Sequence, residues 1–260
     1  MSLFGQTLIV IAAAMTLLWL VSLLRRDASI VDAFWGTGFI LVIGYAFAVT
    51  PPAQVQLRCW LLVGLVLIWG LRLSIHLLLR NIRHGQEDYR YRAMRDYHGE
   101  RFWWVSLFTV FLLQGGILWV VAMPVLATIN VSAGRDLGVR DAIGVAVWLV
   151  GFFFESVGDY QLARFLRAPQ NAGRVMNRGL WRYTRHPNYF GDFCVWWGLY
   201  LISIGGGSAW TIFAPLLMSF LLIKVSGVRL LEKTVTTRRP EYADYQARTS
   251  AFFPWPPRRD

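Results

Sequence analysis

Long apolar stretches alternate with short arginine-rich segments along the whole chain. A helix that crosses a bilayer needs about 20 mostly apolar residues. The stretches of this kind cover residues 3–24, 30–49, 59–79, 102–127, 142–160, 189–204 and 209–231. The last two come from one apolar run that is interrupted at Gly205–Ser208, and a glycine cluster of this kind is a strong turn signal. The pattern predicts an all-α fold, a polytopic membrane helix bundle with seven transmembrane helices.

Positive charge follows the same alternation. The segment after the first predicted span holds Arg25 and Arg26, and the segments after the third, fifth and seventh spans each hold six basic residues. The other three loops hold one, two and no arginines. Because Lys and Arg are enriched in cytoplasmic loops, we expect the N-terminus outside and the C-terminus in the cytoplasm. The net charge is +11, but it is split among separate clusters. This distribution predicts contact with membrane lipids and no nucleic-acid partner.

Composition supports a multi-pass membrane protein. Hydrophobic residues make up 56% of the chain and charged residues only 16%, while a soluble domain averages about 25% charged residues. No internal repeat and no linker divides the sequence. We therefore expect one transmembrane domain over residues 1–260, a monomer, with the short loops pointing to a bacterial inner membrane.

The densest polar segment lies between residues 155 and 192. It ends in the box Arg185–Asp192, directly before an apolar run, and it has no acidic residue from Tyr160 to Gly191. Its arginines are Arg164, Arg167, Arg174, Arg178, Arg182 and Arg185. Guanidinium groups offer a planar fork of donors that matches phosphate oxygens. The segment is either a phosphate-binding site or a loop attracted to anionic lipid heads. Asn188 and Asp192 favour a site, because attraction to lipid does not require them.

The residues of this segment also resemble a known motif. Gly179–Asp192 is similar to the C-terminal motif of the membrane steroid and sterol reductases, which include steroid 5α-reductases and sterol C14-type reductases. Upstream, Asp159-Tyr160 and Arg167-Ala168-Pro169 resemble further parts of that family. The tail from Glu241 to Pro254 does so too, and Ser29–Gly36 suggests a bacterial branch. The resemblance covers residues 150–260 well and residues 30–100 weakly.

The resemblance implies that the C-terminal half binds NADPH. The residues it places in that pocket are Asp159, Arg164, Arg167, Arg174, Tyr183, His186, Asn188, Tyr189, Gly191, Asp192, Arg229, Glu232 and Tyr242. The chain has no Gly-x-Gly-x-x-Gly after a strand, so the pocket is expected between helices rather than in a Rossmann fold. No metal is expected. On this interpretation residues 1–127 form the substrate side and residues 140–260 the cofactor-binding half.

A second polar group is expected inside the membrane. Trp69, Arg72 and His76 share one helix face by their spacing, and Asp32 lies in the preceding predicted helix. A charge at bilayer depth costs about 2.5–3.5 kcal/mol, so Asp32 and Arg72 should pair or line a cavity. A purely structural ion pair is the alternative.

In 5α-reductases a Glu on the second helix and a Tyr on the third polarise the substrate carbonyl. Here Asp32 and Trp35 lie near the first position, and Trp69 stands in place of the tyrosine. The candidate catalytic residues are Asp32, Trp35, Arg72 and His76. The charged segment Gly85–Tyr91 is either a surface loop or a segment that closes over the cofactor.

These features predict an NADPH-dependent reductase. Its substrate would be an enone in a lipophilic ring system, such as a 3-oxo-Δ4 steroid, that enters from the bilayer. The alternative is an S-adenosylmethionine-dependent methyltransferase, because the isoprenylcysteine carboxyl methyltransferases also carry Arg-His-Pro-x-Tyr-x-Gly before a hydrophobic hairpin. Those enzymes continue with a Glu-Glu pair, where this chain has Glu232-Lys233. Asn188 and Asp192 favour the reductase.

Overall fold

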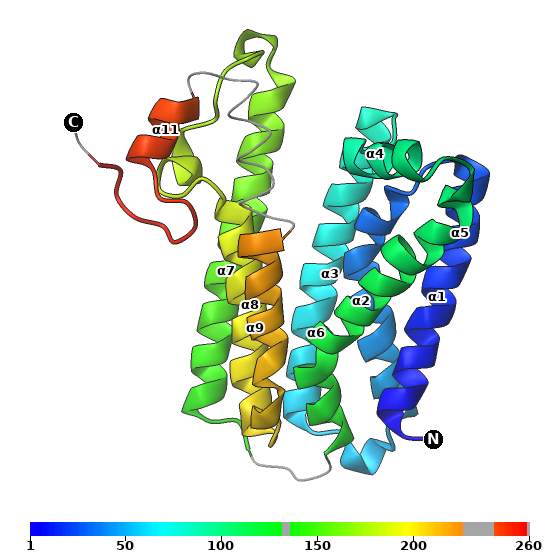
Figure 1. Ribbon diagram of the computed structural model, residues 1–260. Coiled ribbons are helices and arrows are strands. Elements are labelled where there is room, and N and C mark those ends of the chain that lie inside the picture. Colours follow the sequence, from blue (N-terminus) through cyan, green and yellow to red (C-terminus); the bar gives the residue numbers. More distant parts are fainter. Residues whose placement is uncertain (132–135, 226–241, 259–260) are drawn as a thin grey trace. The chain divides into compact units, whose positions relative to one another are not determined.

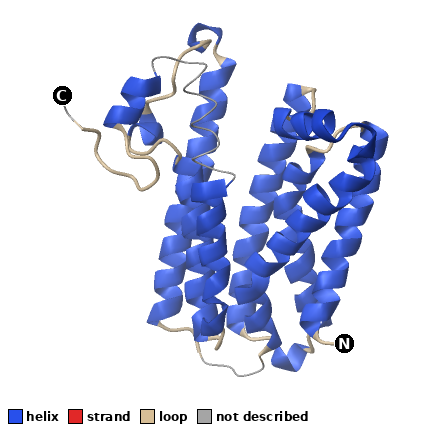
Figure 2. Cartoon of the chain, viewed as in Figure 1, coloured by secondary structure: helices blue, strands red, loops and turns tan. Residues whose placement is uncertain are grey.

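Helices form the regular structure of the described residues (Figure 1). The computed structural model describes residues 1–131, 136–225 and 242–258. Within these residues there is no β-strand, and loops and turns of different lengths connect the helices (Figure 2). The chain divides into two compact units, Met1–Leu137 with Gly206–Thr211, and Gly138–Gly205 with Ile212–Asp260. Each unit is described by itself.

The first unit contains the N-terminal helices. They are α1 (Leu3–Arg25), α2 (Ile30–Val49), α3 (Leu57–His84), α4 (Tyr89–His98), α5 (Phe102–Ser106), a π-helical turn (Leu107–Leu112) and α6 (Leu113–Asn130). Two 3-10 turns, Pro52–Gln54 and Gly99–Arg101, connect them. The core lies where α1, α2, α3 and α6 face one another, and it contains the fully buried Met15, Phe39, Leu62 and Leu118.

Close packing of α2 on α3 fixes the register of these two helices. A Cβ atom on Gly36 would lie 2.1 Å from the carbonyl oxygen of Gly70, so only glycine permits this approach. One turn away, the Thr37 and Ser74 hydroxyls lie 2.9 Å apart. Because the helices are antiparallel, residues nearer the start of α2 lie beside residues nearer the end of α3. Asn81 accordingly donates to the carbonyl oxygen of Ser29.

The second unit is built on a long helix pair. Its helices are α7 (Val139–Arg167), α8 (Pro187–Gly205), α9 (Phe213–Phe220), a π-helical turn (Leu221–Val225) and α11 (Tyr242–Arg248). Gly144, Gly151 and Gly158 recur every seven residues on α7 and face α8. A Cβ on Gly151 would lie 2.6 Å from the carbonyl oxygen of Gly191. This glycine stripe lets the two backbones touch, as small residues do in membrane helix pairs.

The predicted helical segments agree with the observed helices. The segment 30–49 coincides with α2, and α8 ends at Gly205, where the glycine cluster was expected to break the run. Five helical segments are long and apolar enough to cross a membrane: Leu3–Arg25, Ile30–Val49, Leu57–Arg83, Tyr89–Asn130 and Val139–Arg167. The chain is therefore an integral membrane protein. The last predicted span, 209–231, extends beyond the described residues, and the count of seven spans, the orientation and the single-domain organisation stay predictions.

Candidate functional site

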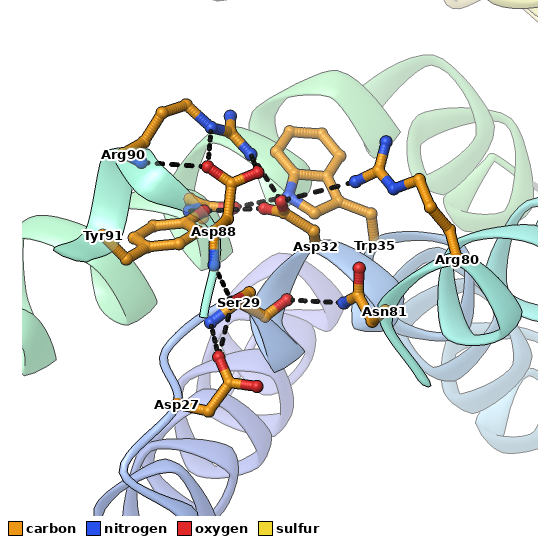
Figure 3. A network of polar contacts seen from close by, with 10 residues as sticks. Asp27, Ser29, Asp32, Trp35, Arg80, Asn81, Asp88, Arg90 and Tyr91 are labelled. Atoms are coloured by element: carbon orange, nitrogen blue, oxygen red, sulfur yellow. Dashed lines mark hydrogen bonds and ion pairs between the residues drawn. The ribbon is translucent and has the colours of Figure 1, made fainter. Parts of the chain in front are cut away.

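Asp32 is the centre of a polar cluster in the first unit (Figure 3). It lies in the first turn of α2, where the helix dipole favours a negative charge. Its Oδ1 accepts a hydrogen bond from the Tyr91 hydroxyl at 2.6 Å, and its Oδ2 accepts one from Arg90 Nη2 at 2.6 Å. Arg80 Nη2 lies 3.9 Å from the same Oδ2. The carboxyl side chain is 14% exposed, so burial strengthens each of these contacts.

The hydrogen bonds continue from Tyr91 toward the interior of the unit. Gln114 on α6 donates through Nε2 to the Tyr91 hydroxyl at 3.2 Å, and Trp35 on α2 donates through Nε1 to Gln114 Oε1 at 2.5 Å. Every donor in this series points toward Asp32. Such a chain polarises each successive group and leaves the Tyr91 hydroxyl with two fixed partners.

Two neighbouring loops hold α4 in the position that brings Tyr91 to Asp32. Gly85 ends α3 with φ 60°, a left-handed conformation that favours glycine. Asp88 then caps α4 by accepting from the Arg90 amide, and the Asp88 amide donates to Ser29 Oγ at 2.8 Å. Glu87 accepts from the Ala28 amide and from Arg95. The loop before α4 is thus bound to the loop before α2 at several points.

Asp88 and Arg90 form an ion pair beside Asp32. Arg90 Nε lies 2.9 Å from Asp88 Oδ1, while its Nη2 reaches Asp32. Burial by itself would raise the pKa of Asp88. Hydrogen bonds from the Arg90 side chain and amide, together with the charges of Arg90 and Arg80, outweigh it, so the pKa lies below 3.8. One guanidinium therefore holds two carboxylates, and Asp88 stays charged at neutral pH.

The predicted pairing of Asp32 with Arg72 is wrong. The partners of Asp32 are Arg90, Tyr91 and Arg80. The register of α2 on α3 explains this, because Thr37 lies beside Ser74 and Asp32 therefore lies beside the last turns of α3. Arg72 lies eight residues before Arg80, about 12 Å along the helix axis.

Trp69 and the candidate catalytic residues other than Asp32 lie at different places. Trp35 joins the Asp32 cluster through Gln114. Trp69 is fully buried with its ring against Phe39, 5.5 Å between centroids. Arg72 and His76 are partly buried on α3 and are not among the partners of Asp32.

Four members of the cluster were not predicted from the sequence: Arg80, Arg90, Tyr91 and Gln114. Arg90 and Tyr91 lie in the charged segment 85–91, whose sequence does not identify the residues that it contacts. Gln114 is a polar residue within the apolar run 102–127, and such a residue usually faces the bundle interior. The sequence therefore indicates that Gln114 faces the interior, but it does not identify Tyr91 and Trp35 as the residues that Gln114 contacts.

In the second unit, the structure brings together part of the predicted NADPH pocket. Asn188 in the first turn of α8 donates through Nδ2 to Asp159 Oδ1 on α7 at 3.1 Å. The rings of His186 and Tyr189 are stacked at 5.5 Å. The indole of Trp181 donates to the carbonyl oxygen of Gly158. These contacts join the start of α8 to the last turns of α7, with Asp192 one turn further along α8.

Gly191 has a packing function that the sequence interpretation did not include. A Cβ at this position would lie 2.4 Å from the Glu155 amide nitrogen and 2.6 Å from the carbonyl oxygen of Gly151. The absent side chain thus allows α7 to approach α8.

The tail, residues 242–258, is bound along the residues before α8. Tyr245 donates its hydroxyl to the carbonyl oxygen of Trp181, and Thr184 Oγ1 donates to the carbonyl oxygen of Phe252 at 2.8 Å. Tyr183 accepts from the Trp255 amide at 2.9 Å through its carbonyl oxygen, while its ring is exposed. Tyr242 is buried with its ring 5.6 Å from that of Tyr245. The tail therefore contacts residues 181–184 of the segment Gly179–Asp192 and stabilises their position.

Arg185 binds the tail through its guanidinium group, although it lies among the arginines of the predicted anion site. Its Nη1 donates to the carbonyl oxygens of Gln246 at 3.0 Å and Thr249 at 2.6 Å, and its amide donates to the carbonyl oxygen of Ser250. A guanidinium committed to two carbonyl oxygens has fewer donors left for phosphate.

Exposed arginines remain at the end of α7 and in the following loop. Arg164, Arg167 and Arg174 are exposed, and Arg164 and Arg167 form no hydrogen bond or ion pair within the described part of the chain. Arg229 and Glu232 lie outside the described residues. No group of three or more His, Cys, Asp or Glu side chains among the described residues could hold a metal ion. The donor set suits a phosphate-bearing ligand.

Comparison with known proteins places the chain in a family. Residues 18–249 match the family model described as a protein of unknown function, DUF1295. The chain is also 27% identical over 266 residues to an uncharacterized protein of the yeast Schizosaccharomyces pombe, covering 91% of this chain and 75% of that protein. A relative thus occurs in a eukaryote, and the bacterial inner membrane stays a prediction. No solved structure matches. This chain belongs to the DUF1295 family of membrane proteins, which are related to the steroid 5α-reductases.

Proposed function

We propose that the protein is an integral membrane reductase that uses NADPH to reduce the carbon–carbon double bond of an enone in a lipophilic substrate. A 3-oxo-Δ4 steroid is one substrate of this chemistry. The observation that carries the proposal is the Tyr91 hydroxyl held 2.6 Å from Asp32 Oδ1. This pair places a tyrosine beside a carboxyl group, as in the 5α-reductases that the sequence resembles. The tyrosine comes from α4, however, rather than from α3.

The chemistry requires a hydrogen-bond donor at the substrate carbonyl. When bound, NADPH supplies a hydride to the β-carbon of the enone, and a proton from solvent completes the reduction. Negative charge develops on the carbonyl oxygen, and a donor fixed there in advance stabilises it. The Tyr91 proton becomes available when the substrate oxygen replaces the Asp32 carboxylate as its acceptor. Tyr91 is therefore the catalytic residue, while Asp32, Arg90 and Gln114 position it.

The second unit supplies groups that fit NADPH. Arg164 and Arg167 have exposed guanidinium groups without acidic partners in the described residues, and Arg174 is exposed beside them in sequence. Such groups suit the pyrophosphate and 2′-phosphate of the cofactor. Asn188 is held by Asp159, and its Oδ1 also accepts from the Tyr189 amide at 3.1 Å. Its amide offers both donors and an acceptor for a ribose or a carboxamide.

Ligand-dependent thermal stability tests this proposal. Purified protein is titrated with NADPH, with NADH and with S-adenosylmethionine. A ligand at 100 times its dissociation constant stabilises by about 2.7 kcal/mol, and NADPH is expected to give the largest increase in melting temperature. Arg167→Gln should reduce that increase, while Arg25→Gln, in the first unit, should not. Stabilisation by S-adenosylmethionine but not by NADPH would replace the reductase with the methyltransferase.

A further inference from the structure

A groove in the first unit lies apart from the Asp32 cluster. It is lined by α1, α2 and α3 and has a volume of about 730 Å³. This volume is within the usual range for a ligand site. On α2 the lining residues are Ile30, Ala33, Phe34 and Thr37, which share one helix face by their spacing. Successive residues turn by about 100°, so Asp32 points away from that face. The groove and the Asp32–Tyr91 pair are therefore separate sites.

The walls of the groove are apolar and open on the outer side of the helices. Leu18 and Val21 come from α1, and Leu71, Ile75, Leu78 and Ile82 come from α3. Ile75 is 56% exposed and Ile82 is 66% exposed. In a helix bundle of a membrane protein, such side chains face lipid. The two hydroxyls in the lining, Thr37 and Ser74, are hydrogen-bonded to each other and so do not require a polar ligand.

Polar groups gather at one end of the groove. Arg25, Asp27, Asn81 and Gln86 line it there. The side chain of Arg25 forms no hydrogen bond or ion pair within the described residues, including with Asp27. Asp27 accepts from the Ser29 amide through Oδ1, and its Oδ2 accepts no hydrogen bond within that same part of the chain. The end of the groove thus presents the Arg25 cation and the Oδ2 oxygen of Asp27, whose charge also interacts with that of Arg95.

We propose that this groove binds a zwitterionic phospholipid. The apolar walls take up one acyl chain, and the second chain lies outside in the bilayer. Arg25 binds the phosphate, for which a guanidinium is suited, and Asp27 binds the ammonium group. The charge pair is what selects this ligand, because a phosphate and an ammonium group together complement Arg25 and Asp27, whereas a neutral ring compound complements neither charge. The inference does not depend on the proposed reductase activity.

Native mass spectrometry of the delipidated full chain in detergent tests the proposal. The probes are phosphatidylethanolamine and phosphatidylglycerol with the same acyl chains. We expect one phosphatidylethanolamine to bind, and phosphatidylglycerol to bind more weakly because it has no ammonium group. Asp27→Asn should reduce that preference. Equal binding of the two lipids to the unmodified protein would overturn the proposal.

Matched variants locate the lipid. Ala33→Trp fills the groove and should weaken binding about tenfold or more, a change of about 1.4 kcal/mol, whereas Ala48→Trp, at an exposed position of α2 away from the groove, should not. Arg25→Gln should weaken binding, and its neighbour Arg26→Gln should not, because Arg26 does not line the groove. If Ala33→Trp destabilises the protein, the two arginine variants still decide. If Arg25→Gln and Arg26→Gln lose lipid binding equally, or if neither loses it, the lipid binds elsewhere.

Discussion

The Tyr91 hydroxyl on α4 donates a hydrogen bond of 2.6 Å to Asp32 Oδ1 on α2. These residues are 59 positions apart in sequence, and both have a second partner, Gln114 for Tyr91 and Arg90 for Asp32. A hydroxyl held from both sides loses little freedom when a substrate binds, which is the condition for effective transition-state stabilisation. Stabilisation of the charge on a substrate carbonyl oxygen would depend on this pair.

Tyr91→Phe removes the hydroxyl and keeps the ring. We expect turnover to fall by about 10²–10⁴-fold, the usual contribution of a positioned acid, while the affinity for NADPH is unchanged. Tyr97→Phe is the matched control, because Tyr97 is on the same helix but 85% exposed. Single-turnover rates and cofactor titrations measure the two quantities. Equal rates for the two variants would remove Tyr91 from the chemistry.

Asp88 makes stability depend on pH in the acid range. Its pKa is below the ordinary value of 3.8 in the folded protein, since burial, which would raise it, is outweighed by the hydrogen bonds and charges of Arg90 and Arg80. The contribution of Asp88 to folding is therefore complete above pH 3.8 and is lost as the pH falls below it.

Asp88→Asn keeps an acceptor at the N-cap of α4 but removes the charge. Melting temperatures of the unmodified protein and the variant, measured from neutral to acid pH, should differ most at neutral pH and converge as the pH falls below 3.8. A difference that is constant over the whole range would show that the charge of Asp88 has no effect on folding.

Gly191→Ala should destabilise the second unit. The added Cβ would lie 2.4 Å from the Glu155 amide nitrogen, which belongs to the backbone of α7 and cannot move aside by a rotamer change. Overpacking of this kind costs about 1–3 kcal/mol. Gly64→Ala is the control, because a Cβ at Gly64 on α3 meets nothing within 4 Å and should raise stability slightly through helix propensity. A neutral Gly191→Ala would mean that α7 and α8 are not packed as described.

Arg185→Ala should loosen the tail, residues 242–258, from the motif before α8. The variant loses two hydrogen bonds to the carbonyl oxygens of Gln246 and Thr249. We expect faster trypsin cleavage at Arg248, followed by mass spectrometry of the released peptide. Arg182→Ala is the matched control, since Arg182 is exposed and forms no hydrogen bond or ion pair in the described segments. Identical cleavage rates would show that Arg185 does not hold the tail.

The helices could be predicted from the sequence because their signal is local. Apolar runs of the length of a bilayer and the glycine cluster at residues 205–207 each act through neighbouring residues. They give the bounds of α2 and the end of α8. The short helix α4 was not predicted, because its residues 89–98 are mostly polar and it is positioned by Asp88, Ser29 and Glu87 rather than by its own periodicity.

The candidate site could be predicted only in part. Helical spacing correctly indicates which residues share a face, but it does not identify the partner across the interface. Spacing alone favours Arg72 as the partner of Asp32, whereas the Gly36–Gly70 contact sets a register that brings Arg80 there instead. The loop before α4 brings Arg90 and Tyr91 to the same carboxylate. In the second unit, the sequence does not distinguish Arg185 from the neighbouring arginines. Only the fold brings Gln246 and Thr249 of the tail to its guanidinium group.

Transfer of isotope from cofactor to lipid distinguishes reduction from methylation. The purified protein is incubated with membrane lipid extract and NADPH that carries deuterium at the transferable position, and in parallel with methyl-labelled S-adenosylmethionine. We predict that a lipid-soluble product gains deuterium with the unmodified protein and with Tyr97→Phe, but not with Tyr91→Phe. A labelled methyl group in the lipid fraction with no deuterium transfer would contradict the reductase account.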